Sequence, residues 1–164
     1  MKKIFTILML IPILLFGQYD ITKNIDLTKN SFYIETQLGF FPQLVLNYER
    51  QISSNKKVNW YGRIGGGYGA NLTDFFNGPE GFGGLCAITM TTGKKNKHFE
   101  FNAGAFLGYE PTLQSAIVRR DITYEPFLLP ILNIGYRYQK PGSGFVFRAN
   151  VGFPSIGVSF GYAF

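Results

Sequence analysis

The last twenty residues of the chain, 145–164, alternate large apolar side chains with small or polar ones. The apolar positions are Phe145, Phe147, Val151, Phe153, Ile156, Val158, Phe160, Tyr162 and Phe164, and the intervening ones include Arg148, Asn150, Gly152, Ser155 and Ser159. A period of two residues predicts β-strands with one apolar face. Strands of soluble proteins rarely place so many aromatic residues on one face, whereas a membrane barrel needs them toward lipid. The segment therefore predicts a hairpin of a membrane β-barrel.

The first 18 residues, MKKIFTILMLIPILLFGQ, place two lysines ahead of an apolar run from Ile4 to Phe16. The run is too short to span a hydrocarbon core, which takes about 20 helical residues. A cleavable export signal over residues 1–18 explains the pattern better, and residues 19–31 then form a short periplasmic lead-in. An uncleaved anchor helix is the alternative.

Alternation with a period of two continues from Phe32 onward, and no helical periodicity interrupts it. The expected strands cover residues 32–40, 44–51, 58–70, 80–92, 98–110, 128–139, 145–153 and 156–164. Pro126 and Pro130 would each remove a ladder hydrogen bond, so the sixth strand is expected to become regular only near residue 128. The expected fold is an all-β, eight-stranded antiparallel up-and-down transmembrane β-barrel over residues 32–164, in which the first strand pairs with the last.

The connections between these strands alternate in length. Short polar turns are expected at 53–57, 93–97 and 140–143, and the longest loops at 71–79 and 111–127. Phe41 and Pro42 are expected to form a tight reversal between the first two strands. Bacterial barrels carry short turns on the periplasmic side and longer loops outside the cell. Both termini are therefore expected in the periplasm.

The outward face is almost free of charge. Only Arg50 and Glu80 fall on it, each near a strand end, whereas Arg or Lys at mid-bilayer costs about 2–4 kcal/mol. Aromatic residues gather at the strand ends, as in the interfacial girdles of membrane proteins. The expected location is the outer membrane of a Gram-negative bacterium, in contact with outer-membrane lipid. A soluble barrel of the lipocalin type, the alternative, would turn its aromatic residues inward.

Three segments resemble a family of small exported β-barrel proteins from Bacteroidetes-type bacteria. They are TGKKNKHFEF at 92–101, GYRYQKPGSGFVFRANVGFP at 135–154 and GVSFGYAF at 157–164. The similarity spans residues 44–164 and concerns turns and girdles. It implies a barrel fold and an outer-membrane location but no particular activity. More distantly, the layout is similar to the eight-stranded transmembrane domain of outer-membrane protein A.

Six charged residues fall on the inward face, near the periplasmic turns. They are Glu35, Glu49, Arg63, Glu100, Arg137 and Arg148. The interior of an eight-stranded barrel is just wide enough for side chains to fill, so these six are expected to meet in one layer. Pairing between guanidinium and carboxylate groups would satisfy most of their hydrogen bonds. We interpret the layer as a structural plug, with a proton or ion path as the alternative.

Glycines at alternate inward positions leave space in the lumen at the end away from the charged layer. That end is expected to hold either a small cavity open to the exterior or a packed interior. The residues concerned are Leu85, Phe106, Leu129 and Ile131, under a loop that bears Arg119 and Arg120. The packed interior, in which the large side chains fill the space left by the glycines, is the favoured interpretation.

His98 and Glu100 form the one pair that suggests catalysis, because some outer-membrane lipid A deacylases resemble this barrel in size and use a histidine and a carboxylate beside a serine. The expected topology speaks against it. His98 is expected at the periplasmic rim, Ser155 at the external end and Ser159 near mid-strand. A lipid-modifying enzyme is therefore kept only as the alternative function.

Composition argues against several other partners. The formal net charge of +6 falls to +4 (6 − 2) if Lys2 and Lys3 leave with the export signal. The lysines bunch in short turns rather than along one face with interleaved aromatics, so no nucleic acid is expected. Cys86 is the single cysteine, which excludes an intrachain disulfide and a multi-cysteine metal site. We expect a monomer without metal or cofactor.

The expected role is structural, or binding and adhesive through the two long loops. Tyr162 and Phe164 end the last strand. This aromatic end resembles the signal by which the barrel-assembly machinery recognises its precursors, so that machinery is an expected partner.

Overall fold

The computed structural model describes residues 28–55, 57–70, 79–92, 96–116, 119–142 and 144–164, without the side chains of 112–122. The expected export signal, most of the lead-in and most of the loop at 71–79 lie outside the described residues. The strands are β1 (Asn30–Gly39), β2 (Gln43–Ser54), β3 (Val58–Gly69), β4 (Gly81–Thr92), β5 (Lys97–Ala116), β6 (Arg119–Gln139), β7 (Gly144–Phe153) and β8 (Ser155–Ala163). In this part of the chain, no helix is long and apolar enough to cross a membrane.

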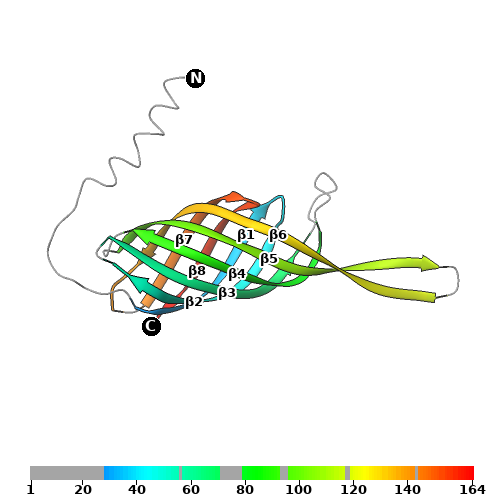
Figure 1. Cartoon of the computed structure of the whole chain (residues 1–164), viewed down its shortest axis with the longest axis horizontal. Coiled ribbons are helices and arrows are strands. Elements are labelled where there is room, and N and C mark those ends of the chain that lie inside the picture. The colour runs from blue at the N-terminus through cyan, green and yellow to red at the C-terminus, as the bar shows by residue number, and fades with distance from the viewer. Residues whose placement is uncertain (1–27, 56, 71–78, 93–95, 117–118, 143) are drawn as a thin grey trace, which may run out of the picture.

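The eight strands close into one barrel (Figure 1). Each strand pairs in antiparallel fashion with the next, and β1 pairs with β8 from Ser31↔Ala163 to Gly39↔Ser155. The predicted eight-stranded barrel and the pairing of its first strand with its last are both confirmed. Closure removes the free sheet edges from the wall of the barrel.

The barrel exposes apolar side chains and buries polar ones. In β1 the buried residues Tyr33, Glu35 and Gln37 alternate with the exposed residues Ile34 and Leu38. The other strands of the wall follow the same alternation. This polarity is the reverse of that in a soluble domain, in which charged residues are almost never fully buried.

The prediction of a long loop at 111–127 was wrong. β5 and β6 continue past the barrel wall as a two-stranded ribbon that remains paired as far as Ala116↔Arg119. The pairing of β5 with β4 extends only to Tyr109, so the ribbon beyond that point stands clear of the other strands. Figure 1 shows it as an arm, projecting from the end of the barrel opposite to the C-terminus.

The positions of three prolines explain why the ribbon forms in spite of them. Pro111 pairs with Tyr124, Pro126 with Tyr109, and Pro130 with Ala105. These pairs are an even number of steps apart, and antiparallel pairs alternate between hydrogen-bonded and non-hydrogen-bonded types. All three therefore belong to one type, and a proline fits the non-hydrogen-bonded type, in which its nitrogen faces the outer edge.

That outer edge has no partner strand at any of the three prolines. The pairing of β6 with β7 begins only at Leu132, and the pairing of β5 with β4 stops at Tyr109. The missing N–H groups therefore cost the wall no ladder bond.

An aromatic cluster fills the lumen at the end from which the arm leaves. The ring centroid of Phe41 lies 5.4 Å from that of Phe106 and 5.6 Å from that of Phe127, and the latter two lie 6.1 Å apart. We call these three residues the aromatic cap. Phe41, predicted to be part of a turn, instead folds inward and is buried. Val45 and Leu85 pack in the same cluster.

Inward-facing glycines make room for the aromatic cap. A Cβ atom added to Gly69 would overlap the ring of Phe41, and one added to Gly108 would overlap that of Phe127. Gly66 lies on the same strand as Gly69, but a Cβ atom added there would lie 3.9 Å from the nearest atom.

We expect Gly69→Ala to destabilise the barrel by about 1–3 kcal/mol, because the added methyl group overpacks the aromatic cap. Gly66→Ala, the matched control on the same strand, should leave stability within about 0.5 kcal/mol of the unmodified protein. Urea unfolding followed by the fluorescence of Trp60 measures both. Equal effects of the two substitutions would contradict the role assigned to Gly69.

Candidate functional site in the barrel lumen

The six charged residues expected on the inward face all lie buried inside the lumen. They come from six strands: Glu35 from β1, Glu49 from β2, Arg63 from β3, Glu100 from β5, Arg137 from β6 and Arg148 from β7. None of them is more than 1% exposed. A buried charge is costly unless a partner neutralises it, so the pairing among these six decides whether the lumen can exist in this form.

Four of the six form a closed ionic cluster. Arg137 Nη1 lies 2.5 Å from Glu49 Oε1 and 3.2 Å from Glu100 Oε1. Arg148 Nε lies 2.8 Å from Glu100 Oε2, and Arg148 Nη1 lies 3.6 Å from Glu49 Oε2. Each arginine therefore contacts both glutamates, and the formal charges of the cluster cancel.

Arg63 and Glu35 form a separate ion pair. Arg63 Nε also donates a hydrogen bond of 2.9 Å to Asn47 Oδ1. Glu35 accepts hydrogen bonds from Gln37 Nε2 at 2.6 Å and from Asn150 Nδ2 at 3.3 Å. Amide side chains from three strands therefore hold this pair in place.

Tyr33 links the ion pair to the cluster. Its ring centroid lies 4.6 Å from Arg148 Cζ and 5.7 Å from Arg63 Cζ. Its hydroxyl group contacts Arg148 and donates a 3.3 Å hydrogen bond to Glu49 Oε2. A cation over an aromatic face in a desolvated site is stabilised by about 2 kcal/mol. Tyr33 therefore joins the two groups of charges into one network.

Tyr61 of β3 also contacts the cluster, with its ring centroid 4.8 Å from Arg137 Cζ. Neither Tyr33 nor Tyr61 was among the residues expected in the charged layer. The available signal was their spacing, since each lies two residues from a member of the network, Glu35 or Arg63. Residues two apart on a strand share a face.

The described residues contain no group of three or more His, Cys, Asp or Glu side chains that could hold a metal ion. The network consists of ion pairs, amides and aromatic faces, with its charged groups turned toward one another. Chemically, such an arrangement can hold together strands that are not adjacent in the sheet, and it can fill the lumen.

The residues expected at the external mouth separate into two groups. Phe106, Leu85 and Ile131 are buried in the apolar cluster, and Leu129 packs against it. Arg119 and Arg120 do not roof them. These two arginines lie near the tip of the arm, seven and six pairs beyond Tyr109, which corresponds to roughly 20 Å along a strand. The expected roof was wrong because the segment continues as paired strands instead of folding back.

The residues of the catalytic alternative are not brought together. His98 is the second residue of β5, and its Nδ1 lies 2.8 Å from the carbonyl oxygen of Thr92. Ser155 opens β8, which puts it at the opposite end of the barrel because β5 and β8 run in opposite directions. Ser159 lies between Glu35 and Arg148 in the register of neighbouring strands.

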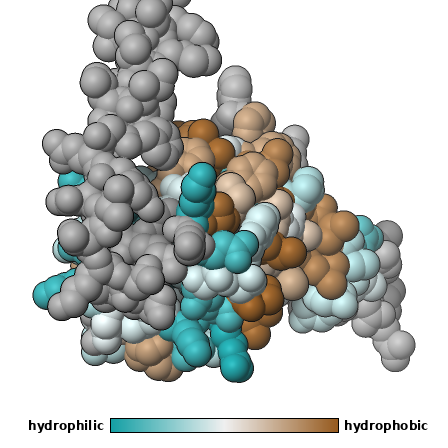
Figure 2. All heavy atoms as spheres, turned by 60° about the vertical axis from the view of Figure 1, so that its left-hand side comes forward, coloured by the Kyte–Doolittle hydropathy of each residue, from teal (hydrophilic) through white to brown (hydrophobic). Residues whose placement is uncertain are grey.

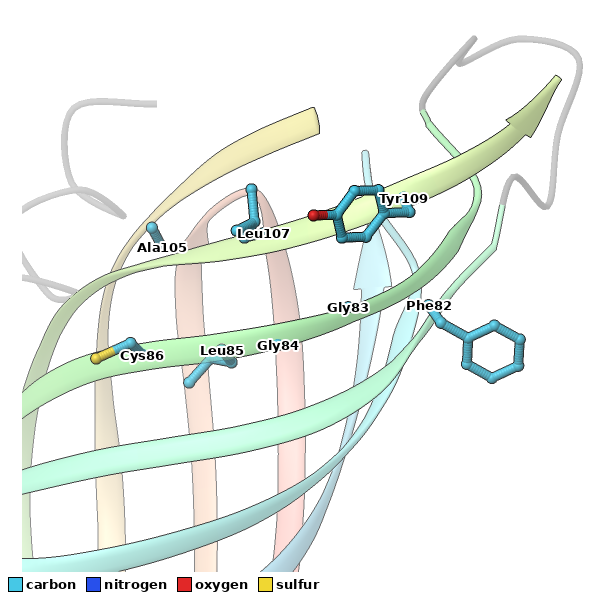
Figure 3. A pocket seen from close by; sticks show the side chains of 8 residues that line it. All are labelled: Phe82, Gly83, Gly84, Leu85, Cys86, Ala105, Leu107 and Tyr109. Carbon is cyan, nitrogen blue, oxygen red and sulfur yellow. The ribbon is translucent and has the colours of Figure 1, made fainter. Parts of the chain in front are cut away.

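A shallow hollow lies on the outside of the wall, between β4 and β5 (Figure 3). Its lining consists of Phe82, Gly83, Gly84, Leu85, Cys86, Ala105, Leu107 and Tyr109. Gly84 leaves free space in it, since a Cβ atom added there would lie 3.7 Å from the nearest atom. The hollow faces the surroundings of the barrel and is distinct from the lumen.

Comparisons with known proteins support the fold alone. No family model and no curated protein matches the chain. A solved structure, the N-terminal β-barrel domain of Pseudomonas aeruginosa OprF, is similar with a TM-score of 0.54 at 10% sequence identity. The match covers 84% of this chain and 98% of the OprF domain. The chain therefore shares the eight-stranded barrel architecture of that domain, and membership of a Bacteroidetes family stays a prediction.

We expect Glu35→Gln to destabilise the barrel by about 3–5 kcal/mol, because it leaves the buried guanidinium of Arg63 without its counter-charge. The double variant Glu35→Gln/Arg63→Met should recover much of this loss, since no unpaired charge then remains. Glu125→Gln on the exposed arm is the control and should change stability by less than about 0.5 kcal/mol. Additive losses in urea unfolding would contradict the pairing.

Proposed function

We propose that this protein is a monomeric outer-membrane β-barrel with a closed lumen, serving a structural or binding role through its projecting arm. One observation carries the proposal. The closed wall exposes apolar side chains all along its outer face and buries an internally neutralised set of charges. This polarity suits a barrel surrounded by lipid.

The membrane location draws further support from the ends of the strands. The outward charge Arg50 lies four residues from the end of β2, and Glu80 immediately precedes β4. Between these levels the outer face is apolar, with exposed residues such as Ile64 and Ile88. The expected export signal would carry such a chain to the outer membrane.

Two groups of side chains that fill the lumen support the proposal that it is closed. The ionic network occupies the part of the lumen nearer the short turns, and the aromatic cap occupies the part nearer the arm. An ion would have to displace buried aromatic rings and then cross a neutralised network. We therefore favour a structural plug over an ion path.

The arm is the part best placed for contacts beyond the membrane. An isolated two-stranded ribbon is marginally stable in water, so a partner outside the cell would stabilise it. The lipid-modifying alternative gains nothing from the geometry, because His98 and Ser155 lie at opposite ends of the barrel.

We further propose that the barrel-assembly machinery recognises the aromatic end of β8. Tyr162 and Phe164 are both exposed, and Phe164 exchanges backbone hydrogen bonds of 2.9 and 3.1 Å with Asn30. These bonds lie at the seam between β1 and β8. A signal at this seam would be accessible before the barrel closes.

Planar-bilayer recording tests the closed lumen. We expect the purified protein to give no large, steady conductance steps, because the aromatic cap and the ionic network fill the lumen. A porin reconstituted in the same bilayer is the positive control. Steady conductance in the range of that porin would overturn the plug.

Trypsin treatment of intact cells tests the orientation. Arg119 and Arg120 on the arm should be cut from outside, whereas the lysines of the short turns, among them Lys57 and Lys97, should be cut only after the outer membrane is permeabilised. A variant with Arg119→Gln and Arg120→Gln should resist cleavage in intact cells. Cleavage of the short turns in intact cells would contradict the orientation.

A further inference from the structure

Charges outside the lumen separate by sign between the two rims of the barrel wall, whereas the arm carries both signs, with Arg119 and Arg120 near its tip. At the end with the short turns, the exposed charged side chains of the described residues are cationic: Lys29, Arg50, Lys57, Lys97 and Lys140. We call these five residues the basic collar. The same turns include three further lysines in the sequence, Lys56, Lys94 and Lys95. The described acidic residues outside the lumen lie at the other end: Glu80, Glu110, Asp121 and Glu125.

The basic collar is distributed around the rim instead of forming a patch on one side. Lys29 precedes β1, Arg50 and Lys57 flank the β2–β3 turn, Lys97 opens β5, and Lys140 follows β6. Figure 2 shows hydrophilic residues gathered at this end of the molecule, next to the hydrophobic side wall. A partner that surrounds the barrel fits this distribution better than a protein that docks on one side.

Aromatic residues lie at the same level as the collar and face outward. Trp60 follows Lys57 by three residues, and Phe99 follows Lys97 by two. Both aromatic side chains are 38% exposed. Tryptophan and tyrosine mark the headgroup level of a bilayer, and long cationic side chains extend from that level toward the phosphates.

We propose that the basic collar binds the phosphate groups of anionic phospholipids in the periplasmic leaflet of the outer membrane. The inference rests on the proposed membrane location and goes beyond it, because it assigns a lipid class to one end of the barrel. Clustered cations attract anionic lipid surfaces, by about fivefold in affinity for each lysine or arginine near the surface. The opposite rim carries acidic residues such as Glu80 and Glu110, and the arginines Arg119 and Arg120 lie roughly 20 Å beyond it along the arm.

Trp60 is the only tryptophan of the chain and lies within the collar, so it reports which lipids are in contact there. The protein is reconstituted in two sets of phosphatidylcholine vesicles. One set contains a small fraction of brominated phosphatidylglycerol, and the other contains the same fraction of brominated phosphatidylcholine. Bromine quenches tryptophan fluorescence at short range. We expect brominated phosphatidylglycerol to quench Trp60 at an effective concentration at least fivefold lower, and the preference to fade at high salt.

The variant Arg50→Gln/Lys57→Gln should lose most of this preference, because it removes the two cations of the collar in the β2–β3 region, which contains Trp60. The variant Arg119→Gln/Arg120→Gln loses the same charge from the arm and should keep the preference. Equal quenching by the two lipids in the unmodified protein would overturn the proposal that the basic collar binds anionic phospholipids, leaving an acidic periplasmic protein as its partner. A preference for phosphatidylglycerol that survives in Arg50→Gln/Lys57→Gln would also overturn it. Quenching by neither lipid would instead overturn the membrane location itself.

Discussion

Closure of eight strands into one barrel imposes the constraint on which the rest of the structure depends. Such an interior is just wide enough for side chains, so every second residue of the wall is withdrawn from the surroundings. A charge at one of these positions has to be neutralised by another strand. Glu49 and Glu100 each contact two guanidinium groups, and Arg63 pairs with Glu35. The ionic network is therefore a condition of the closed fold, and it ties together strands that are not neighbours in the sheet.

The two halves of the lumen meet this constraint with different chemistry. Near the short turns, ion pairs neutralise the charges, and amide side chains donate hydrogen bonds to them. Near the arm, the ring of Phe41 packs against Phe106 and Phe127, in space left by glycines such as Gly69 and Gly108. Aromatic pairs contribute about 0.5–1.5 kcal/mol beyond the area that they bury. The combination leaves a rigid wall on which the exposed parts, the arm and the basic collar, can act.

The outer surface of the barrel is apolar along the side wall, and its two ends differ in charge. Its apolar side wall is bounded by cations at one end and by acidic residues at the other, and the arm leaves from the acidic end. Inside the lumen the three arginines and three glutamates cancel, so the charge asymmetry of the molecule comes from its ends. The proposed functions follow this division, with lipid contacts at the basic end and external contacts at the arm.

The sequence by itself determined the number of strands, the closure of the first strand on the last, and the inward face on which Glu35, Arg148 and the other lumen charges lie. A period of two assigns each residue to a face whatever its partner is. Tertiary structure alone decided that Arg137 and Arg148 share two glutamates, because strand tilt sets which inward side chains meet. It also turned Phe41 inward and continued β5 and β6 past Pro126. An inward turn needs free space beside it, and a proline is tolerated where the strand edge that it faces has no partner.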